Sequence, residues 1–398
     1  MTPDVSTAME EILNRAVETG AVPGAAFVLT GPEGDVREVT AGTLRVGDDD
    51  PVTPATIYRL MSMTKAVVSA GALQLVEAGE LGLDQKVASI IPEFGEIKVL
   101  DGFDGDRPRL RDPSRPATVQ QLFTHTSGHG YVFLRPELVR YYEVTGLPDP
   151  LSGVRSSLQQ PLVADPGTEW NYGISLDWLG LVVAAVSGQD LPAYLTEHVL
   201  DPLEMSDTTF APSDEQRSRL MAIHSRTPDG GLAISELDLP AEPEYWAGGH
   251  GLYGTAGDYA RFMAALLAGG ELNGNRILRP ETVDLMFTDH LAGVPLPPDG
   301  TVSTMPELSN DVPPLPFTQT FGLGLHVFTE DLPGMRRAGS GDWSGLCNCY
   351  YWIDRASGVA GAFLTQVVPF YDAQILEPLL GTEMGVYAEI LAASQPPA

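Results

Sequence analysis

The sequence predicts an α/β (α+β) protein in which a sheet-containing domain is interrupted by a long, mainly helical segment. Two observations predict this class. Segments typical of strands lie near both ends of the chain, and the middle alternates short helices with loops rich in Pro and Gly. No internal repeat or clean linker separates two consecutive domains. We therefore expect residues 1–80 and 319–398 to form a discontinuous α/β domain, and residues 81–318 to form a mainly helical domain.

The elements predicted near the N-terminal end are a helix, a hairpin and a second, apolar helix. Apolar residues at helical spacing predict a helix over residues 7–19, and residues 25–29 and 36–40 are predicted strands around the turn at 31–34. A strongly apolar helix is expected from Ser62 to Ala78, ended by Gly79 and Gly82.

Further elements are predicted along the rest of the chain. The predicted helices cover residues 119–124, 175–187, 191–199 and 257–268, and a final helix covers 372–392. The predicted strands cover residues 321–328, 347–353 and 359–365. Residues 294–318 contain seven prolines and little periodicity, so we expect a long surface loop there.

Composition and hydropathy argue against several classes of partner and indicate where the protein is located. The 53 acidic and 23 basic residues give a net charge of -30, which argues against nucleic acid and anionic membranes as partners. The sequence shows no signal core and no apolar run of the roughly 18–20 residues needed to span a bilayer. The two cysteines, Cys347 and Cys349, do not resemble a disulfide framework. We expect a cytoplasmic protein.

The tetrad Ser62-Met63-Thr64-Lys65 carries the first chemical signal. A serine hydroxyl is a weak nucleophile until a base removes its proton, and residues three apart on a helix lie on one face. A helix N-terminus favours the negative charge that develops during attack. Lys65 can act as a base only in its neutral form, which its apolar neighbours in sequence would favour. The alternative is a surface lysine near a helix-capping serine.

Competing motifs are weaker. No Gly-x-Ser-x-Gly elbow occurs, which disfavours an α/β-hydrolase. His125 and His129 are four apart but lack the Glu of the metalloprotease pattern, so we expect no metal and no cofactor. We interpret His125 as satisfying backbone groups at a helix end and His250, among glycines, as structural.

Several longer segments carry a family resemblance. They are Leu122-Phe123-Thr124-His125-Thr126-Ser127-Gly128, Pro166-Gly167-Thr168-Glu169-Trp170-Asn171-Tyr172, Pro202-Leu203-Glu204-Met205 and Gly251-Leu252-Tyr253-Gly254-Thr255. Together with the tetrad, the sequence resembles the serine β-lactamase and penicillin-binding-protein superfamily, particularly the class C-like family VIII carboxylesterases. Residues 130–134 and 321–324 are most similar to the branch with bacterial esterases and fungal statin side-chain acyltransferases. The resemblance implies a β-lactamase-like antiparallel sheet flanked by terminal helices, with the active site at the interface with the helical domain.

The resemblance also assigns site residues. Tyr172 takes the place of the second-motif tyrosine, which shares a proton with Lys65; which of the two deprotonates Ser62 stays open. The third motif falls on Trp343-Ser344-Gly345, and the implied oxyanion hole uses the N–H groups of Ser62 and Leu346. Trp343, Ser344 and Gly345 are expected to bind substrate, Trp343 as a pocket wall and Gly345 by leaving room for the acyl group. Tyr131 and the 294–318 loop are expected at the pocket mouth.

Two departures from the β-lactamase pattern favour an ester substrate. Trp343 replaces the lysine that would meet a substrate carboxylate, and Ile174 replaces an amide-bearing asparagine, so both changes should make the pocket more apolar. We therefore predict a serine carboxylesterase that hydrolyses small neutral esters through a Ser62 acyl-enzyme. The alternatives are an acyltransferase with an alcohol acceptor and a β-lactamase or D-aminopeptidase type of amide hydrolase. A non-catalytic module is less favoured because Ser62, Lys65 and Tyr172 are all present, and the oligomeric state is left open.

Overall fold

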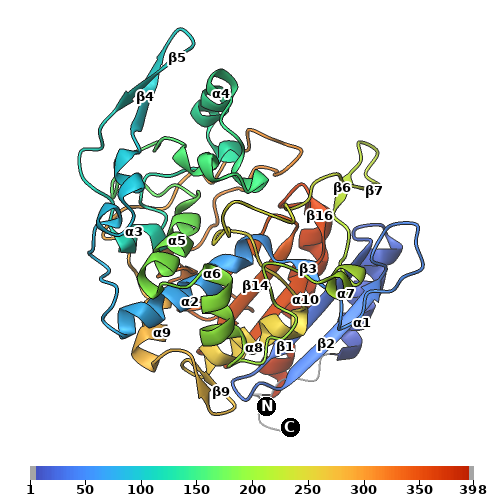
Figure 1. Ribbon diagram of the computed structural model, residues 1–398. Helices are drawn as coiled ribbons and strands as arrows, with labels where there is room; N and C mark the ends of the chain where they lie inside the picture. Colours follow the sequence, from blue (N-terminus) through green and yellow to red (C-terminus); the bar gives the residue numbers. More distant parts are fainter. Residues whose placement is uncertain (1–5, 394–398) are drawn as a thin grey trace.

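A seven-stranded antiparallel sheet forms the centre of the computed structural model, which describes residues 6–393 (Figure 1). The strand order is β11-β12-β13-β14-β15-β1-β2, and every neighbouring pair is antiparallel. The strands are β1 (Gly24–Thr30), β2 (Val36–Gly42), β11 (Gln319–Phe321), β12 (His326–Phe328), β13 (Gly341–Gly345), β14 (Cys349–Asp354) and β15 (Val359–Leu364). Because β1 pairs with β15, the N-terminal hairpin joins the C-terminal strands in one sheet. The predicted α/β class with an antiparallel sheet is confirmed.

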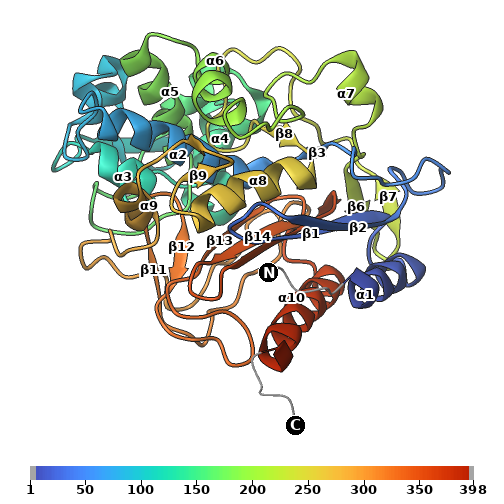
Figure 2. The same cartoon turned by 90° about the horizontal axis from the view of Figure 1, so that it is seen from below.

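Helices cover both faces of this sheet. Helices α1 (Ser6–Glu18) and α10 (Ala373–Ala393) lie on one face, and α8 (Ala256–Leu267) lies on the other (Figure 2). All seven residues of β1 are buried, because its odd-numbered side chains pack with α1 and α10 and its even-numbered side chains pack with α8. A strand covered on both faces has a continuous apolar run instead of an alternating pattern.

The remaining elements lie mostly in the segment that the sequence analysis assigned to a helical domain. The helices are α2 (Thr64–Glu77), α3 (Val119–Phe123), α4 (Pro136–Thr145), α5 (Ser175–Ser187), α6 (Leu191–Leu195), the π-helix η7 (Thr196–Leu200), α7 (Asp214–Ser218) and α9 (Pro280–Met286). The short 3-10 turns are η1 (Met61–Met63), η2 (Val87–Ser89), η3 (Pro92–Glu96), η4 (Val132–Leu134), η5 (Pro150–Ser152) and η6 (Arg155–Gln159). The small strands are β3 (Tyr58–Arg59), β4 (Val99–Asp104), β5 (Arg107–Arg111), β6 (His224–Arg226), β7 (Leu232–Ile234), β8 (Tyr253–Gly254), β9 (Glu271–Leu272), β10 (Asn275–Arg276) and β16 (Val367–Val368).

Helix α2 runs through the interior of the molecule. Its residues are buried from Thr64 to Leu73, so almost no turn faces water. A helix that is apolar on all sides is stable only when it is covered on all sides. Gly71 permits one of these contacts, since a Cβ at that position would lie 2.5 Å from Leu195 Cδ2. Helix α2 is therefore rigid, and the residues directly before it are attached to a fixed element.

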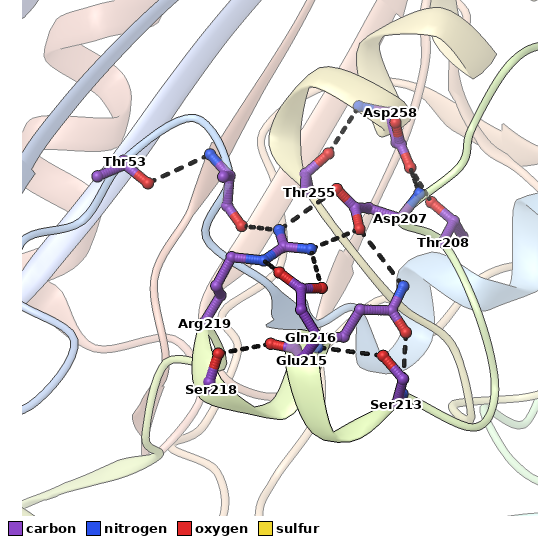
Figure 3. A network of polar contacts seen from close by, with 11 residues as sticks. Thr53, Asp207, Thr208, Ser213, Glu215, Gln216, Ser218, Arg219, Thr255 and Asp258 are labelled. Carbon is purple, nitrogen blue, oxygen red and sulfur yellow. Dashed lines mark hydrogen bonds and ion pairs between the residues drawn. The ribbon is translucent and has the colours of Figure 1, made fainter.

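A polar network fixes the chain segment that leads to α2 (Figure 3). Arg219 donates to Asp207 Oδ1 at 2.7 Å, to Glu215 Oε1 at 2.8 Å and to the carbonyl of Ala55. Asp258 lies in the first turn of α8, and its Oδ2 accepts a hydrogen bond from the backbone N–H of Asp207 at 2.8 Å. These contacts connect residues 53–57 to α7 and to the start of α8. The chain segment that precedes η1 is therefore held in place by two other elements.

The structure corrects two predicted strands. Residues 321–328 form the end of β11, a turn and β12 instead of one strand, because the N–H of Gly322 bonds the carbonyl of Leu325 and Gly324 adopts a φ of 96°. The predicted strand at 347–353 begins only at Cys349, and Cys347 lies in the preceding turn. Strand β13 was not predicted. Both cysteines are buried with free thiols.

The other predicted elements agree with the structure within a few residues. Helix α5 has the predicted bounds, whereas the helix expected at 191–199 divides into α6 and η7. No helix or strand lies between α9 and β11, as expected for the 294–318 loop. Within residues 6–393, none of the helices combines the length and apolar character that crossing a bilayer requires. The division at 81 and 318 stays a prediction, and α8 from that segment packs on the sheet.

Candidate active site

Ser62 lies in the 3-10 turn η1, directly before α2, and not in the α-helix where it was expected. The preceding residue, Met61, is buried and has a positive φ of 48°, a conformation that costs a non-Gly residue free energy unless its surroundings hold it. The hydroxyl side of Ser62 faces a cavity, although the residue is only 9% exposed. A strained backbone thus presents the serine at the start of a buried helix.

Two side chains bond the Ser62 hydroxyl at the same time. Lys65 Nζ lies 2.8 Å from Ser62 Oγ, and the phenol of Tyr172 donates to the same oxygen at 2.6 Å. The spacing of three residues places Lys65 one helical turn from Ser62 as predicted, whereas Tyr172 arrives from the segment before α5. The structure therefore brings together the serine, lysine and tyrosine that the sequence singled out.

Lys65 is buried without a carboxylate at its amine. Its other bonds are 2.8 Å to the carbonyl of Gly249 and 3.2 Å to Tyr131 OH, so its three donors meet three oxygens. Nζ also lies 4.8 Å from the centroid of the Tyr172 ring. No carboxylate of the described residues lies within ion-pair distance of Nζ. The amine of Lys65 is therefore surrounded by hydroxyl and carbonyl oxygens instead of a direct charge partner.

Tyr131 and Tyr172 form adjacent walls of this site. The N–H of Tyr131 bonds the carbonyl of Tyr172 at 3.0 Å, and their ring centroids are 5.0 Å apart. A Cβ at Gly173 would lie 2.6 Å from the carbonyl of His129, so the two segments approach backbone to backbone. Burial raises the pKa of Tyr131 well above its ordinary value, with a further contribution from Asp177. Tyr131 thus stays a neutral phenol beside Lys65.

Strand β13 supplies the opposite wall. Trp343, Ser344, Gly345 and Leu346 all line the cavity, and Trp343 Nε1 donates to Tyr172 OH at 3.2 Å. Gly345 has a packing role that the sequence did not indicate, because a Cβ there would lie 2.5 Å from the carbonyl of Leu60. Its missing side chain lets β13 contact the turn that presents Ser62.

Ser62 and Leu346 both line this cavity. Backbone N–H groups beside a nucleophilic serine are the kind of donor that stabilises the oxyanion of acyl transfer. The assignment of the Ser62 and Leu346 N–H groups to an oxyanion hole stays a prediction.

An aromatic cluster that was not predicted from the sequence surrounds Tyr172. His125 packs edge-on against Tyr172 with ring centroids 4.9 Å apart, and the Phe321 ring lies 5.4 Å from the rings of both His125 and Trp343. The Trp170 ring stacks on that of Tyr172 at 6.3 Å. Trp170 is near Tyr172 in sequence, but His125, Phe321 and Trp343 are distant from it, so only the aromatic content of residues 170–172 could have indicated part of the cluster.

Two interpretations from the sequence need correction. Neither ring nitrogen of His125 bonds a described residue, so it does not satisfy backbone groups; burial and the charge of Lys65 lower its pKa well below 6.5. His250 lines the cavity, and its interpretation as structural stays a prediction. Ile174 was expected to make the pocket apolar, but it is fully buried in the core and is not a lining residue.

The cavity in front of Ser62 has a volume of about 320 Å³ and a mainly apolar lining. The 294–318 loop contributes seven of the apolar lining residues: Leu296, Pro297, Leu308, Val312, Pro313, Pro314 and Leu315. Phe133 and Tyr371 border it from other segments. The expected position of the loop and of Tyr131 at the pocket agrees with this lining. A cavity of this size can enclose a small organic molecule.

A family model described as Beta-lactamase matches residues 9–380, and the chain therefore belongs to the β-lactamase family. Monacolin J acid methylbutanoyltransferase from Aspergillus terreus is 33% identical over 400 residues, which cover 96% of this chain and 95% of that protein. Lovastatin esterase from Penicillium rubens is 32% identical over 394 residues, which cover 94% and 96% of the two chains. The unliganded selenomethionyl structure of simvastatin synthase (LovD) from Aspergillus terreus has a TM-score of 0.84 at 31% identity, covering 97% of this chain and 98% of its own.

These findings confirm the resemblance and the β-lactamase-like fold. The relatives are enzymes that transfer or hydrolyse acyl groups, which supports an enzymatic function with small-molecule acyl substrates. They agree better with acyl transfer, the alternative in the sequence analysis, than with ester hydrolysis as the main activity.

Proposed function

We propose that this protein is a serine acyltransferase that forms an acyl-enzyme at Ser62 and passes the acyl group to an alcohol, with water as a competing acceptor. One observation carries the proposal: Ser62 Oγ is bonded by both Lys65 Nζ and Tyr172 OH at the edge of an apolar cavity. A hydroxyl held between two proton-exchanging groups is an activated nucleophile.

The first half-reaction is attack of Ser62 Oγ on the carbonyl carbon of a donor ester. The Ser62 proton passes to the Lys65–Tyr172 pair. The oxyanion that develops on the carbonyl oxygen accepts hydrogen bonds from the N–H groups of Ser62 and Leu346. When the tetrahedral intermediate collapses, the bond to the donor alkoxy group breaks and that group leaves as an alcohol with the proton from the pair. In the second half-reaction an acceptor alcohol gives its proton to the same pair and attacks the acyl carbon. The bond between the acyl carbon and Ser62 Oγ then breaks, and Ser62 Oγ takes the proton back from the pair.

The lining of the cavity favours neutral substrates. Trp343 stands where many relatives carry a lysine, and its indole bonds Tyr172 instead of offering a charge. Arg336 lines the cavity, but its guanidinium is occupied by Glu383 and Asp342. A substrate carboxylate would therefore find no free guanidinium or ammonium partner in this lining, which disfavours β-lactams.

The relatives suggest the kinds of donor and acceptor. We propose a short branched acyl group such as methylbutanoyl, and a bulky alcohol of the kind that a monacolin J acid acyltransferase uses. The apolar loop over residues 294–318 would cover such an acceptor and limit the access of water. Ester hydrolysis is the second candidate, supported by the lovastatin esterase relative.

The test measures the fate of the acyl group. Wild-type protein and Ser62→Ala are incubated with p-nitrophenyl butyrate, with and without a bulky secondary alcohol, and nitrophenol, butyrate and butyrate ester are quantified. We expect Ser62→Ala to lose about a thousandfold or more in rate, and the wild type to form mostly the new ester when the alcohol is present. Equal rates for the two proteins would refute the role of Ser62. Free butyrate alone would identify an esterase, and rapid hydrolysis of nitrocefin would identify a β-lactamase.

A further inference from the structure

A buried carboxylate lies behind Lys65, in the first turn of α5. Asp177 has no exposed surface, and its Oδ1 accepts the backbone N–H of Gly249 at 3.0 Å. Its Oδ2 has no hydrogen-bond partner among the described residues. Burying an ionised carboxylate with one neutral hydrogen bond is costly, so this position needs a compensating interaction.

The backbone of Gly249 joins this carboxylate to the proposed catalytic lysine. The N–H of Gly249 bonds Asp177, and the carbonyl of the same residue accepts Lys65 Nζ at 2.8 Å. A Cβ at Gly249 would lie 2.6 Å from Asp177 Oδ2, so the glycine backbone rests directly on the carboxylate. Gly249 is therefore the one residue that lies between the Asp177 carboxylate and the Lys65 amine.

The charge of Asp177 also acts on other groups at the site. It contributes to the raised pKa values of Tyr131 and Tyr245, in both cases after burial as the larger cause. His250 Nδ1 lies 3.6 Å from Asp177 Oδ1, but burial lowers the pKa of His250 below 6.5 and leaves it neutral near pH 7. The titratable groups around Asp177 and Lys65 are Tyr131, Tyr172, Tyr245, His125, His250 and Asp149.

We propose that Asp177 is a positioning residue for Lys65. It fixes Gly249 so that the carbonyl of Gly249 aims Lys65 Nζ at Ser62, and its negative charge stabilises the ammonium form between proton transfers. The proposal rests on the proposed function, in which Lys65 exchanges a proton with Ser62. An amide could hold the Gly249 N–H equally well, so only the charge requires an aspartate here.

The variant Asp177→Asn distinguishes the effect of the Asp177 charge from the effect of its hydrogen bond to Gly249. The variant keeps an acceptor for Gly249 but loses the anion, so Lys65 gives up its proton more easily. We expect the acid limb of the kcat/KM profile on p-nitrophenyl butyrate to move by about 1 pH unit to lower pH. Asp177→Ser, which also shortens the anchor, should show the same shift with a further loss of about tenfold in rate, because Gly249 is no longer held as firmly.

A matched control comes from a second aspartate at a helix N-terminus. Asp190 caps α6 through a 2.8 Å bond from Ala193 N, but it is exposed. Asp190→Asn should leave the acid limb in place, because water screens its charge. An unshifted limb in folded Asp177→Asn would overturn the proposal, and so would failure of both Asp177 variants to fold by circular dichroism, since that would assign Asp177 to stability. A failure of the proposed function is recognised separately, by retained activity in Ser62→Ala.

Discussion

Two buried cations of this protein have opposite surroundings. Arg336 donates to Glu383 Oε1 at 2.5 Å and Oε2 at 2.8 Å, and it also pairs with Asp342. Lys65 is more deeply buried, at 2% exposure, yet its amine meets two hydroxyls and one carbonyl. Carboxylates in direct contact neutralise the charge of Arg336, whereas the amine of Lys65 contacts only neutral oxygen atoms.

We propose that this difference separates a cation with a structural role, Arg336, from a cation with a catalytic role, Lys65. Although burial works against the charge, Glu383 and Asp342 raise the pKa of Arg336 further above its ordinary value, so its proton stays in place. Lys65 has no such direct partner, and the backbone of Gly249 lies between its amine and the Asp177 carboxylate. General acid–base catalysis requires a group that exchanges its proton with the reacting hydroxyl, and we propose that Lys65 is that group.

The largest expected effect is on activity, from Lys65→Met. The variant keeps a similar apolar stem but removes the proton-exchanging amine, so kcat/KM should fall by about a thousandfold. Thermal unfolding should change less than it does in the corresponding Arg336 variant. A folded Lys65→Met protein within tenfold of the wild-type rate would contradict the role that this comparison gives Lys65.

The next effect is on stability, from Arg336→Met. Removing the guanidinium leaves the buried Glu383 without its cation, whereas the partly buried Asp342 keeps its contact with His326. The free energy of unfolding should therefore fall by about 3 kcal/mol. Denaturant unfolding measures this loss. The double variant Arg336→Met/Glu383→Met is the control, and it should recover part of the stability because it removes one unpaired charge together with its partner.

The smallest effect concerns the pH dependence of stability. Burial alone would raise the pKa of Asp342, but His326 and Arg336 outweigh it and hold that pKa below 3.8. The stabilisation is therefore fully present above pH 3.8 and is lost as the pH falls through the lower folded-state value. Melting temperatures measured from pH 5 to pH 2 should fall more steeply for the wild type than for Asp342→Asn. Parallel curves would show that the Asp342 charge contributes nothing.

Local patterns predicted much of the fold. The β1–β2 hairpin, α5 and α10 follow apolar periodicity and turn residues that act within a few positions. The prediction failed at residues 321–328, where apolar content suggested one strand. A Cβ at Gly322 would lie 2.0 Å from the carbonyl of Met286, so the turn there depends on a contact with another segment.

By itself the sequence determined the Ser62–Lys65 pair, since one helical turn fixes that spacing wherever the helix lies. The resemblance added Tyr172 and Trp343, and the structure places both around the same hydroxyl. Only the tertiary structure decided the rest of the surroundings of Lys65. Tyr131 is 66 positions away and Gly249 is 184 positions away, and no local pattern records which distant backbone will meet a given amine. Packing of the whole chain brings them together, because a buried ammonium must find oxygen partners wherever the fold supplies them.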